Sequence, residues 1–333
     1  MNTDGFRQLV FSSPQRQAMP IATYPGMALT GATVRNVVSA PAAQAEIQAA
    51  LQQRYETKFV LTAMDLSAEA EAFGSEVVLS DHEVPSVIGR IVTSREQADR
   101  LPVPRPGDGR TAVYLEATRR LRRLPGRPLV LGGCIGPFSL AARLVGVTEA
   151  MELTLADPAL MHAVLEKAAR FLAEYARAFQ AAGADGLLMA EPAAGLLSPR
   201  GMSAFSSAYI RQIVESLDGL RFAFILHNCA AKLVHLPAVL ETGLRLFHFG
   251  APMDLAAALR VVPSEVILCG NLDPAAVFCR ATPDEVSVRA TSLLSTVAAH
   301  RNFVISSGCD LPPNSTLTSL DAFYGAVKAF NQR

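Results

Sequence analysis

The sequence predicts a single α/β domain over residues 1–333, built as a TIM-type (β/α)8 barrel. Eight short apolar runs alternate with segments that have helical spacing and helix-capping residues. The runs are continuous rather than alternating, which is typical of parallel strands that are buried on both faces. An open doubly wound sheet is the alternative, but no GxGxxG motif follows the first run.

Composition indicates a large buried core and excludes several classes of partner. Half of the residues are hydrophobic and 18% are charged, which favours a well-packed α/β core. Thirty basic residues balance thirty acidic ones, so there is no electrostatic basis for binding nucleic acid or an anionic membrane. No membrane-spanning apolar stretch and no signal peptide are evident. We therefore expect a cytoplasmic protein whose five cysteines are reduced and serve in packing or metal binding.

The first half of the chain supplies an N-terminal helix and loop at 1–17 and the first four predicted strands. These strands lie at 18–26, 58–65, 129–134 and 186–191. Helices are expected at 42–55, 66–74, 94–101 and 138–146. A long helix should start at Pro158, capped by Asp157, and run to about Ala182. Residues 76–110 form an excursion between the second and third strands, with a small hairpin at 76–89.

The second half repeats the strand–helix alternation regularly. Its predicted strands lie at 222–229, 244–250, 266–274 and 303–309, and its helices lie at 202–217, 231–241, 255–260 and 319–330. Thr282 and Glu285, with Pro283 between them, have the spacing of a capping box, which predicts a further helix before the last strand.

Polar and reactive side chains occur where the predicted strands end. In a barrel of parallel strands all the carboxyl ends meet at one face, and that face carries the active site. The residues at these ends are Asp65, Cys134, Glu191, His227, Cys229, His248, Asn271, Asp273 and Cys309.

Three of these residues have the chemistry of a metal site. His227 and Cys229 are two residues apart on one strand, so their side chains point the same way, and Cys309 ends a distant strand. Three soft ligands would leave a fourth position open, as in catalytic zinc sites. The alternative is that the isolated pair His227 and Cys229 is only part of the buried core.

Five motifs carry a resemblance to a known superfamily. They run in order over nearly the whole chain and are MDLSAEAEAFG, GLLMAEPAAGLLSP, LHNC, CGNLDP and SSGCDLPP. By these motifs the chain resembles the uroporphyrinogen decarboxylase superfamily, and more closely its methylcobalamin:coenzyme M methyltransferase branch. The resemblance implies a (β/α)8 barrel and a zinc site formed by an H-x-C…C set, which maps onto His227, Cys229 and Cys309.

Two local features separate this chain from the decarboxylases of that superfamily. Decarboxylases carry an Arg-Gln-Ala-Gly-Arg stretch that binds substrate carboxylates, whereas the comparable region here reads RQAMPIATYPG and lacks the second arginine. Their last strand tends to end in Gly-His, where this chain has Gly308 and Cys309. Both differences favour zinc chemistry over decarboxylation.

The resemblance therefore implies a zinc-dependent methyltransferase. It would move a methyl group from a methylated corrinoid, protein-bound or free methylcobalamin, to a small thiol such as coenzyme M or homocysteine. The candidate catalytic residues are Glu191 and Asp65, and the candidate cofactor-binding residues are Gly133, Cys134, Asn271 and Asp273. Structural alternatives stay open for several of them: a helix cap or ion pair for Glu191, a structural role for Asp65, and core or turn packing for Cys134.

Rival functions remain at this point. One is a cofactor-free decarboxylase acting on a porphyrinogen-like substrate, and another is a non-catalytic protein that binds corrinoid or a metal–thiol complex. A corrinoid protein is the expected partner, and the decarboxylase relatives suggest a homodimer. The sequence leaves the methyl acceptor and the direction of transfer open, so a folate also remains as an acceptor.

Overall fold

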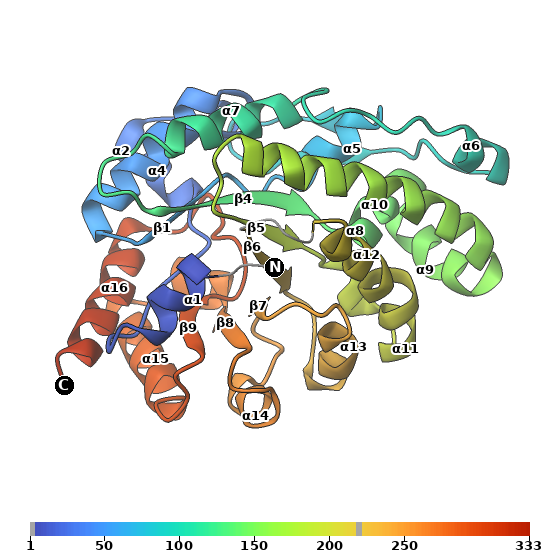
Figure 1. The fold of residues 1–333 in the computed structure, drawn as a ribbon. Coiled ribbons are helices and arrows are strands. Elements are labelled where there is room, and N and C mark those ends of the chain that lie inside the picture. The colour runs from blue at the N-terminus through green and yellow to red at the C-terminus, as the bar shows by residue number, and fades with distance from the viewer. Residues whose placement is uncertain (1–3, 218–221) are drawn as a thin grey trace.

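The computed structural model describes residues 4–217 and 222–333, and its centre is a parallel sheet (Figure 1). Seven strands pair in chain order, each parallel to the next: β1 (Phe59–Leu61), β4 (Leu129–Ile135), β5 (Gly186–Ala190), β6 (Ala223–Asn228), β7 (Leu246–Phe249), β8 (Ile267–Leu272) and β9 (Phe303–Ser307). Almost every strand position is buried, as the continuous apolar runs predict. Seven of the eight predicted strands are thus confirmed.

The prediction of a regular strand at 18–26 is wrong. Ala18 makes a single parallel bridge to Ile305 of β9, and the chain then turns into a 3₁₀ helix at Tyr24–Gly26. Prolines at 20 and 25 have no N–H to donate, which prevents a continued ladder. Within the described part of the chain no ladder joins this segment to β1. The sheet therefore curls into a barrel that is not closed by hydrogen bonds at this seam.

The concave side of the sheet is filled with apolar side chains. Alternate strand positions point inward, because successive residues of a strand face opposite sides, and the inner cluster includes Leu61, Leu131, Leu188, Ile225, Leu246, Ile267 and Val304. Helix α1 (Asp4–Phe11) packs Phe6 and Val10 into the same cluster near the amino ends of the strands. Polar inward positions are thereby confined to the carboxyl ends.

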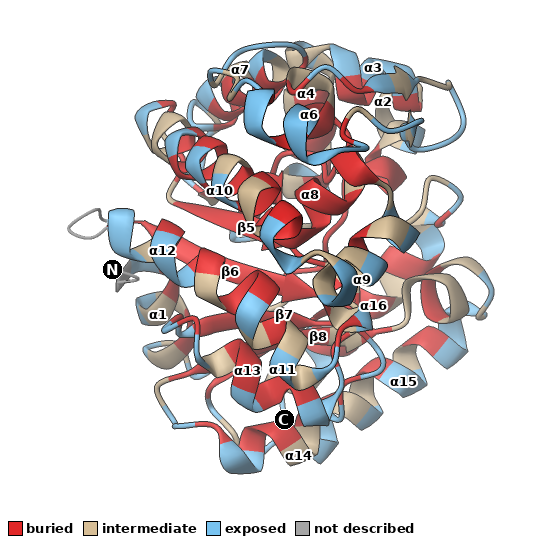
Figure 2. Ribbon diagram, turned by 90° about the vertical axis from the view of Figure 1, so that its right-hand side faces the viewer, coloured by how far each residue is buried: buried red, intermediate tan, exposed pale blue. Residues whose placement is uncertain are grey.

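Helices cover the outer side of the sheet and turn their buried faces toward it (Figure 2). They are α2 (Met27–Thr30), α3 (Val34–Ser39), α4 (Pro41–Tyr55), α5 (Ala68–Ala72), α6 (Arg95–Arg100), α7 (Thr111–Leu121), α8 (Pro137–Val145), α9 (Val147–Ala156), α10 (Pro158–Ala181), α11 (Pro199–Met202), α12 (Ala208–Ser216), α13 (Leu236–Leu240), α14 (Leu255–Val261), α15 (Pro283–Thr296) and α16 (Leu317–Asn331). In the described residues, none of them is long and apolar enough to cross a membrane.

Two helix-start predictions and the hairpin prediction are confirmed. The Asp157 carboxylate accepts the Leu160 N–H at 3.0 Å and caps α10. Thr282 and Glu285 form the reciprocal capping box at the start of α15. Between β1 and β4, strands β2 (Glu76–Val78) and β3 (Ser86–Ile88) pair antiparallel as a separate two-stranded sheet.

Candidate metal centre

The fold brings His227, Cys229 and Cys309 together at the carboxyl ends of the strands. His227 is the inward residue near the end of β6, Cys229 follows that strand, and Cys309 lies two residues beyond β9. Their ligand atoms all lie within 4.8 Å of one another. Strands β7 and β8 separate β6 from β9 in the sheet, so the curl of the sheet is what brings these ends close.

Glycines allow the backbones around this cluster to approach closely. A Cβ built on Gly250 would overlap the carbonyl group of Cys229, and one on Gly308 would lie 3.0 Å from the backbone nitrogen of Ala251. Only a residue without a side chain fits such contacts with neighbouring backbone. The loops after β6, β7 and β9 are therefore packed against one another, which holds both cysteines in place.

The orientation of His227 leaves one ring nitrogen free. The residue is 1% exposed, and its Nδ1 lies 2.8 Å from Nδ1 of His248. Its Nε2 is buried and has no hydrogen-bond partner in the described residues. An unpaired buried nitrogen is unfavourable by about 1–3 kcal/mol. Coordination of a metal ion would satisfy it.

The two thiols interact directly. A hydrogen bond with Cys309 is the main cause that lowers the pKa of Cys229 to about 4. The same hydrogen bond raises the pKa of Cys309 above the usual range of a thiol. Of the two sulfurs, Cys229 therefore loses its proton more readily, and a thiolate is the form that binds metals. One imidazole nitrogen and two cysteine sulfurs match the ligand preference of Zn²⁺.

The two predicted catalytic carboxylates are engaged elsewhere in the structure. Glu191 accepts the backbone N–H groups of Phe138 at 2.7 Å and Ser139 at 2.8 Å, and so caps the start of α8. Asp65 pairs with the Arg110 guanidinium and accepts the Tyr114 hydroxyl at 2.8 Å. These contacts correspond to the structural alternatives for both residues, and a catalytic role for either remains a prediction.

The predicted cofactor-binding residues likewise have partners within the fold. The Cys134 side chain packs in the layer between the sheet and the helices, where burial raises its pKa, so it does not face the barrel interior. Asn271 donates its amide to the carbonyls of Gly250 and Met253, and Asp273 caps the turn that follows β8. A Cβ on Gly133 would meet Met64 at 2.9 Å. A cofactor-binding role for these four residues remains a prediction.

Two residues beside His227 were not assigned a role from the sequence. His248 is completely buried, and its Nε2 lies 2.8 Å from the hydroxyl of Ser306. Burial, followed by the proximity of His227, lowers the pKa of His248 well below its usual value. Both are the last inward positions of the observed strands β7 and β9, and the inward register within the predicted strands is the signal that could have identified them.

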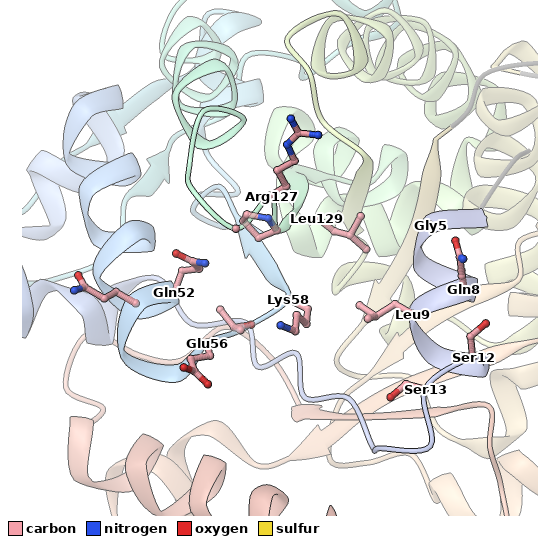
Figure 3. Close-up of a pocket in the computed structure, with 14 residues that line it drawn as sticks. Gly5, Gln8, Leu9, Ser12, Ser13, Gln52, Glu56, Lys58, Arg127 and Leu129 are labelled. Atoms are coloured by element: carbon pink, nitrogen blue, oxygen red, sulfur yellow. The ribbon is translucent and has the colours of Figure 1, made fainter.

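A cavity of about 810 Å³ opens at the other end of the barrel (Figure 3). It lies between α1 and the residues that precede β1 and β4, including Lys58 and Arg127. Its lining contains none of the residues predicted to be functional. The chemistry of the His/Cys cluster therefore outweighs the size of this cavity as a guide to function.

Comparison with known proteins assigns the family. The profile described as "Uroporphyrinogen decarboxylase (URO-D)" matches residues 12–330. Among curated relatives, "Methylcobamide:CoM methyltransferase MtbA" of Methanosarcina acetivorans is 28% identical over 270 residues, covering 80% of this chain and 78% of the relative. MtbA of Methanosarcina mazei is 31% identical over 234 residues, covering 69% and 68%. The "Uroporphyrinogen decarboxylase" of Psychromonas ingrahamii is 26% identical over 287 residues, covering 82% and 80%.

A solved structure agrees with this assignment at the level of the fold. The "methyltransferase from Methanosarcina mazei" superposes with a TM-score of 0.87 over 98% of this chain and 97% of that one, at 22% sequence identity. The relatives thus include both methyltransferases and decarboxylases. The match over nearly the whole chain shows that this protein belongs to the uroporphyrinogen decarboxylase (URO-D) family.

Proposed function

We propose that this protein is a zinc-dependent methyltransferase that moves a methyl group from a methylated corrinoid to a small thiol. The observation that carries the proposal is the cluster of His227, Cys229 and Cys309, with ligand atoms within 4.8 Å and an unpaired, buried His227 Nε2. Two relatives named as methylcobamide:CoM methyltransferases support it. Coenzyme M and homocysteine are the acceptors we would test first.

The residues of the cluster would hold the metal and leave room for the acceptor. Zn²⁺, when bound, supplies a positive charge that keeps a coordinating thiol deprotonated yet reactive. His227, Cys229 and Cys309 would hold the ion, and the acceptor sulfur would bind at the position that catalytic zinc sites keep open for a substrate. Because these residues lie at the buried ends of strands, their side chains have fixed directions and would hold a bound acceptor in one orientation.

Methyl transfer then forms a sulfur–carbon bond and breaks the cobalt–carbon bond, and the electron pair of that bond stays on cobalt. No proton has to move in this step, because the acceptor already reacts as a thiolate. This explains why the cluster needs no separate general base. We propose that the corrinoid reaches the open face on a partner protein or as free methylcobalamin, and that the enzyme works as a homodimer.

The test compares two cysteine variants. Purified wild-type protein should contain close to one zinc per chain by elemental mass spectrometry, and should demethylate methylcobalamin in the presence of one thiol of a panel. Cys309→Ala should lose both properties. Cys279→Ala is the matched control, because Cys279 is half-buried and lies outside the His/Cys cluster.

Two results would reject the proposal. One is a Cys309→Ala variant that keeps its zinc and its activity. The other is a wild-type protein that binds no zinc under reducing conditions and decarboxylates a porphyrinogen after chelator treatment. The second result would establish the decarboxylase function of the other named relatives instead.

A further inference from the structure

We propose that His248 and Ser306 are positioning residues that hold His227 in the tautomer with a proton on Nδ1 and a bare Nε2. The inference rests on the proposed zinc site for its purpose, since the bare Nε2 is what a metal ion requires. Its evidence is a chain of three hydrogen bonds that ends on a backbone carbonyl: His227 to His248, His248 to Ser306, and Ser306 to Met19.

The direction of this relay follows from its far end. The Ser306 hydroxyl contacts the carbonyl oxygen of Met19, and a carbonyl can only accept. The single proton of the hydroxyl is therefore used there. Toward His248, 2.8 Å away, the serine oxygen can only accept, so Nε2 of His248 must carry a proton.

The second step concerns the other nitrogen of His248. This residue is 0% exposed, and in the described residues its ring contacts another imidazole and a hydroxyl rather than a carboxylate. A buried imidazole without a counter-charge stays neutral. With its proton on Nε2, its Nδ1 is an acceptor.

The third step gives the tautomer of His227. Its Nδ1 lies 2.8 Å from the accepting Nδ1 of His248 and must donate the proton of that hydrogen bond. A neutral imidazole has one N–H only, so its Nε2 carries a lone pair. That nitrogen is the one without a partner in the described residues. The relay therefore selects the ligand nitrogen before any metal arrives.

The sheet fixes the geometry of the relay. His227 and His248 are register partners on β6 and β7, and their rings are inclined at 71° with centroids 4.7 Å apart. Ser306 lies on β9, opposite Asn271 of β8. Hydrogen bonds from a ligand histidine to a fixed partner typically contribute 10–100-fold to metal affinity. In this protein, strands β6, β7 and β9 and the segment at Met19 hold the residues of the relay in place.

The first experiment reads the tautomer directly in metal-free protein. Long-range ¹H–¹⁵N correlation of ¹⁵N-histidine-labelled protein distinguishes a protonated from a bare ring nitrogen. We expect His227 to carry its proton on Nδ1 in the wild type, and Ser306→Ala to release the alternative tautomer. A wild-type His227 with its proton on Nε2, or with both nitrogens protonated, would overturn the proposal.

The second experiment measures zinc affinity by chelator competition. His248→Leu removes the acceptor and should weaken zinc binding about 10–100-fold, whereas His248→Asn can offer its Oδ1 near the position of Nδ1 and should stay within about threefold. His235→Leu is the matched control, since His235 is also buried and hydrogen-bonded but contacts Leu197 and Lys232.

The outcomes separate this inference from the proposed function. The relay would be rejected if His248→Leu bound zinc as tightly as the wild type, or if His235→Leu lost as much zinc affinity as His248→Leu. Either result would show that His248 only contributes to core packing. A wild type that binds no zinc would reject the proposed function, and the metal-free tautomer would still decide for or against the relay.

Discussion

Replacing Arg110 with methionine tests whether the buried ion pair between Arg110 and Asp65 stabilises the fold. The Arg110 side chain is 9% exposed and the Asp65 side chain 1%. Asp65 also accepts the Tyr114 hydroxyl at 2.8 Å and the Ser67 N–H at 3.0 Å. Arg110→Met would leave the Asp65 carboxylate without its charged partner in a buried position.

Breaking a buried pair from one side destabilises by about 3–5 kcal/mol, because the remaining charge stays desolvated. A further ion pair with Glu71, 32% exposed, adds less because solvent screens it. A 333-residue chain has an unfolding entropy of about 0.7 kcal/mol/K, so we expect the melting temperature to fall by about 4–7 °C. The control is Arg119→Met, which breaks an exposed pair with Glu116 and should change stability by less than about 1 kcal/mol.

The assay is thermal and urea unfolding of Arg110→Met, Arg119→Met and the double variant Asp65→Asn/Arg110→Met. The double variant removes both charges, so it should be more stable than Arg110→Met alone. The reasoning is refuted if Arg110→Met has the same melting temperature as Arg119→Met. It is also refuted if the double variant is the least stable of the three. Zinc content should be unchanged in the folded variants, whereas its loss would place Asp65 in the functional site.

Two further perturbations have defined outcomes. Burial raises the pKa of Glu69 to about 8, so the folded state keeps a proton that the unfolded state releases above its usual pKa. The free energy of unfolding should therefore fall as pH rises from about 4.5 to 8, by at most about 5 kcal/mol. Urea titrations should show a weaker pH dependence of this free energy for Glu69→Gln than for the wild type. The same pH dependence in both proteins would contradict this. The methyl group of Gly250→Ala would overlap the Cys229 carbonyl and should lower zinc affinity. Gly325→Ala is the control, because the space around Gly325 is open and zinc affinity should not change. Equal zinc affinities of the two variants would show that the loop after β7 adjusts freely.

The sequence predicted the arrangement of the strands well, because their signal is local. A run of buried residues with helices on both sides predicts a parallel strand wherever it occurs, and such runs at 129–134 and 303–309 became β4 and β9. The grouping of His227 with Cys309 also followed, since parallel strands put all their carboxyl ends at one face. Both inferences needed only the order of the strands and the alternation of side-chain direction along each strand.

The roles of carboxylates at the strand ends could not be predicted in the same way. Glu191 and Asp65 both end predicted strands, yet one caps α8 and the other pairs with Arg110. Arg110 lies 45 residues from Asp65 in the chain, at the end of the excursion that contains β2 and β3. Which partner a buried carboxylate finds depends on loop paths, and loop paths have no simple sequence period.

The one strand that was predicted wrongly is connected to the proposed relay. Pro20 follows Met19 and interrupts the ladder that would have closed the barrel toward β1. The Met19 carbonyl has no backbone donor in the described part of the chain, and the Ser306 hydroxyl donates to it. A buried carbonyl requires such a partner. The irregular seam thus provides the acceptor that sets the direction of the relay, and through His248 it determines which nitrogen of His227 remains bare.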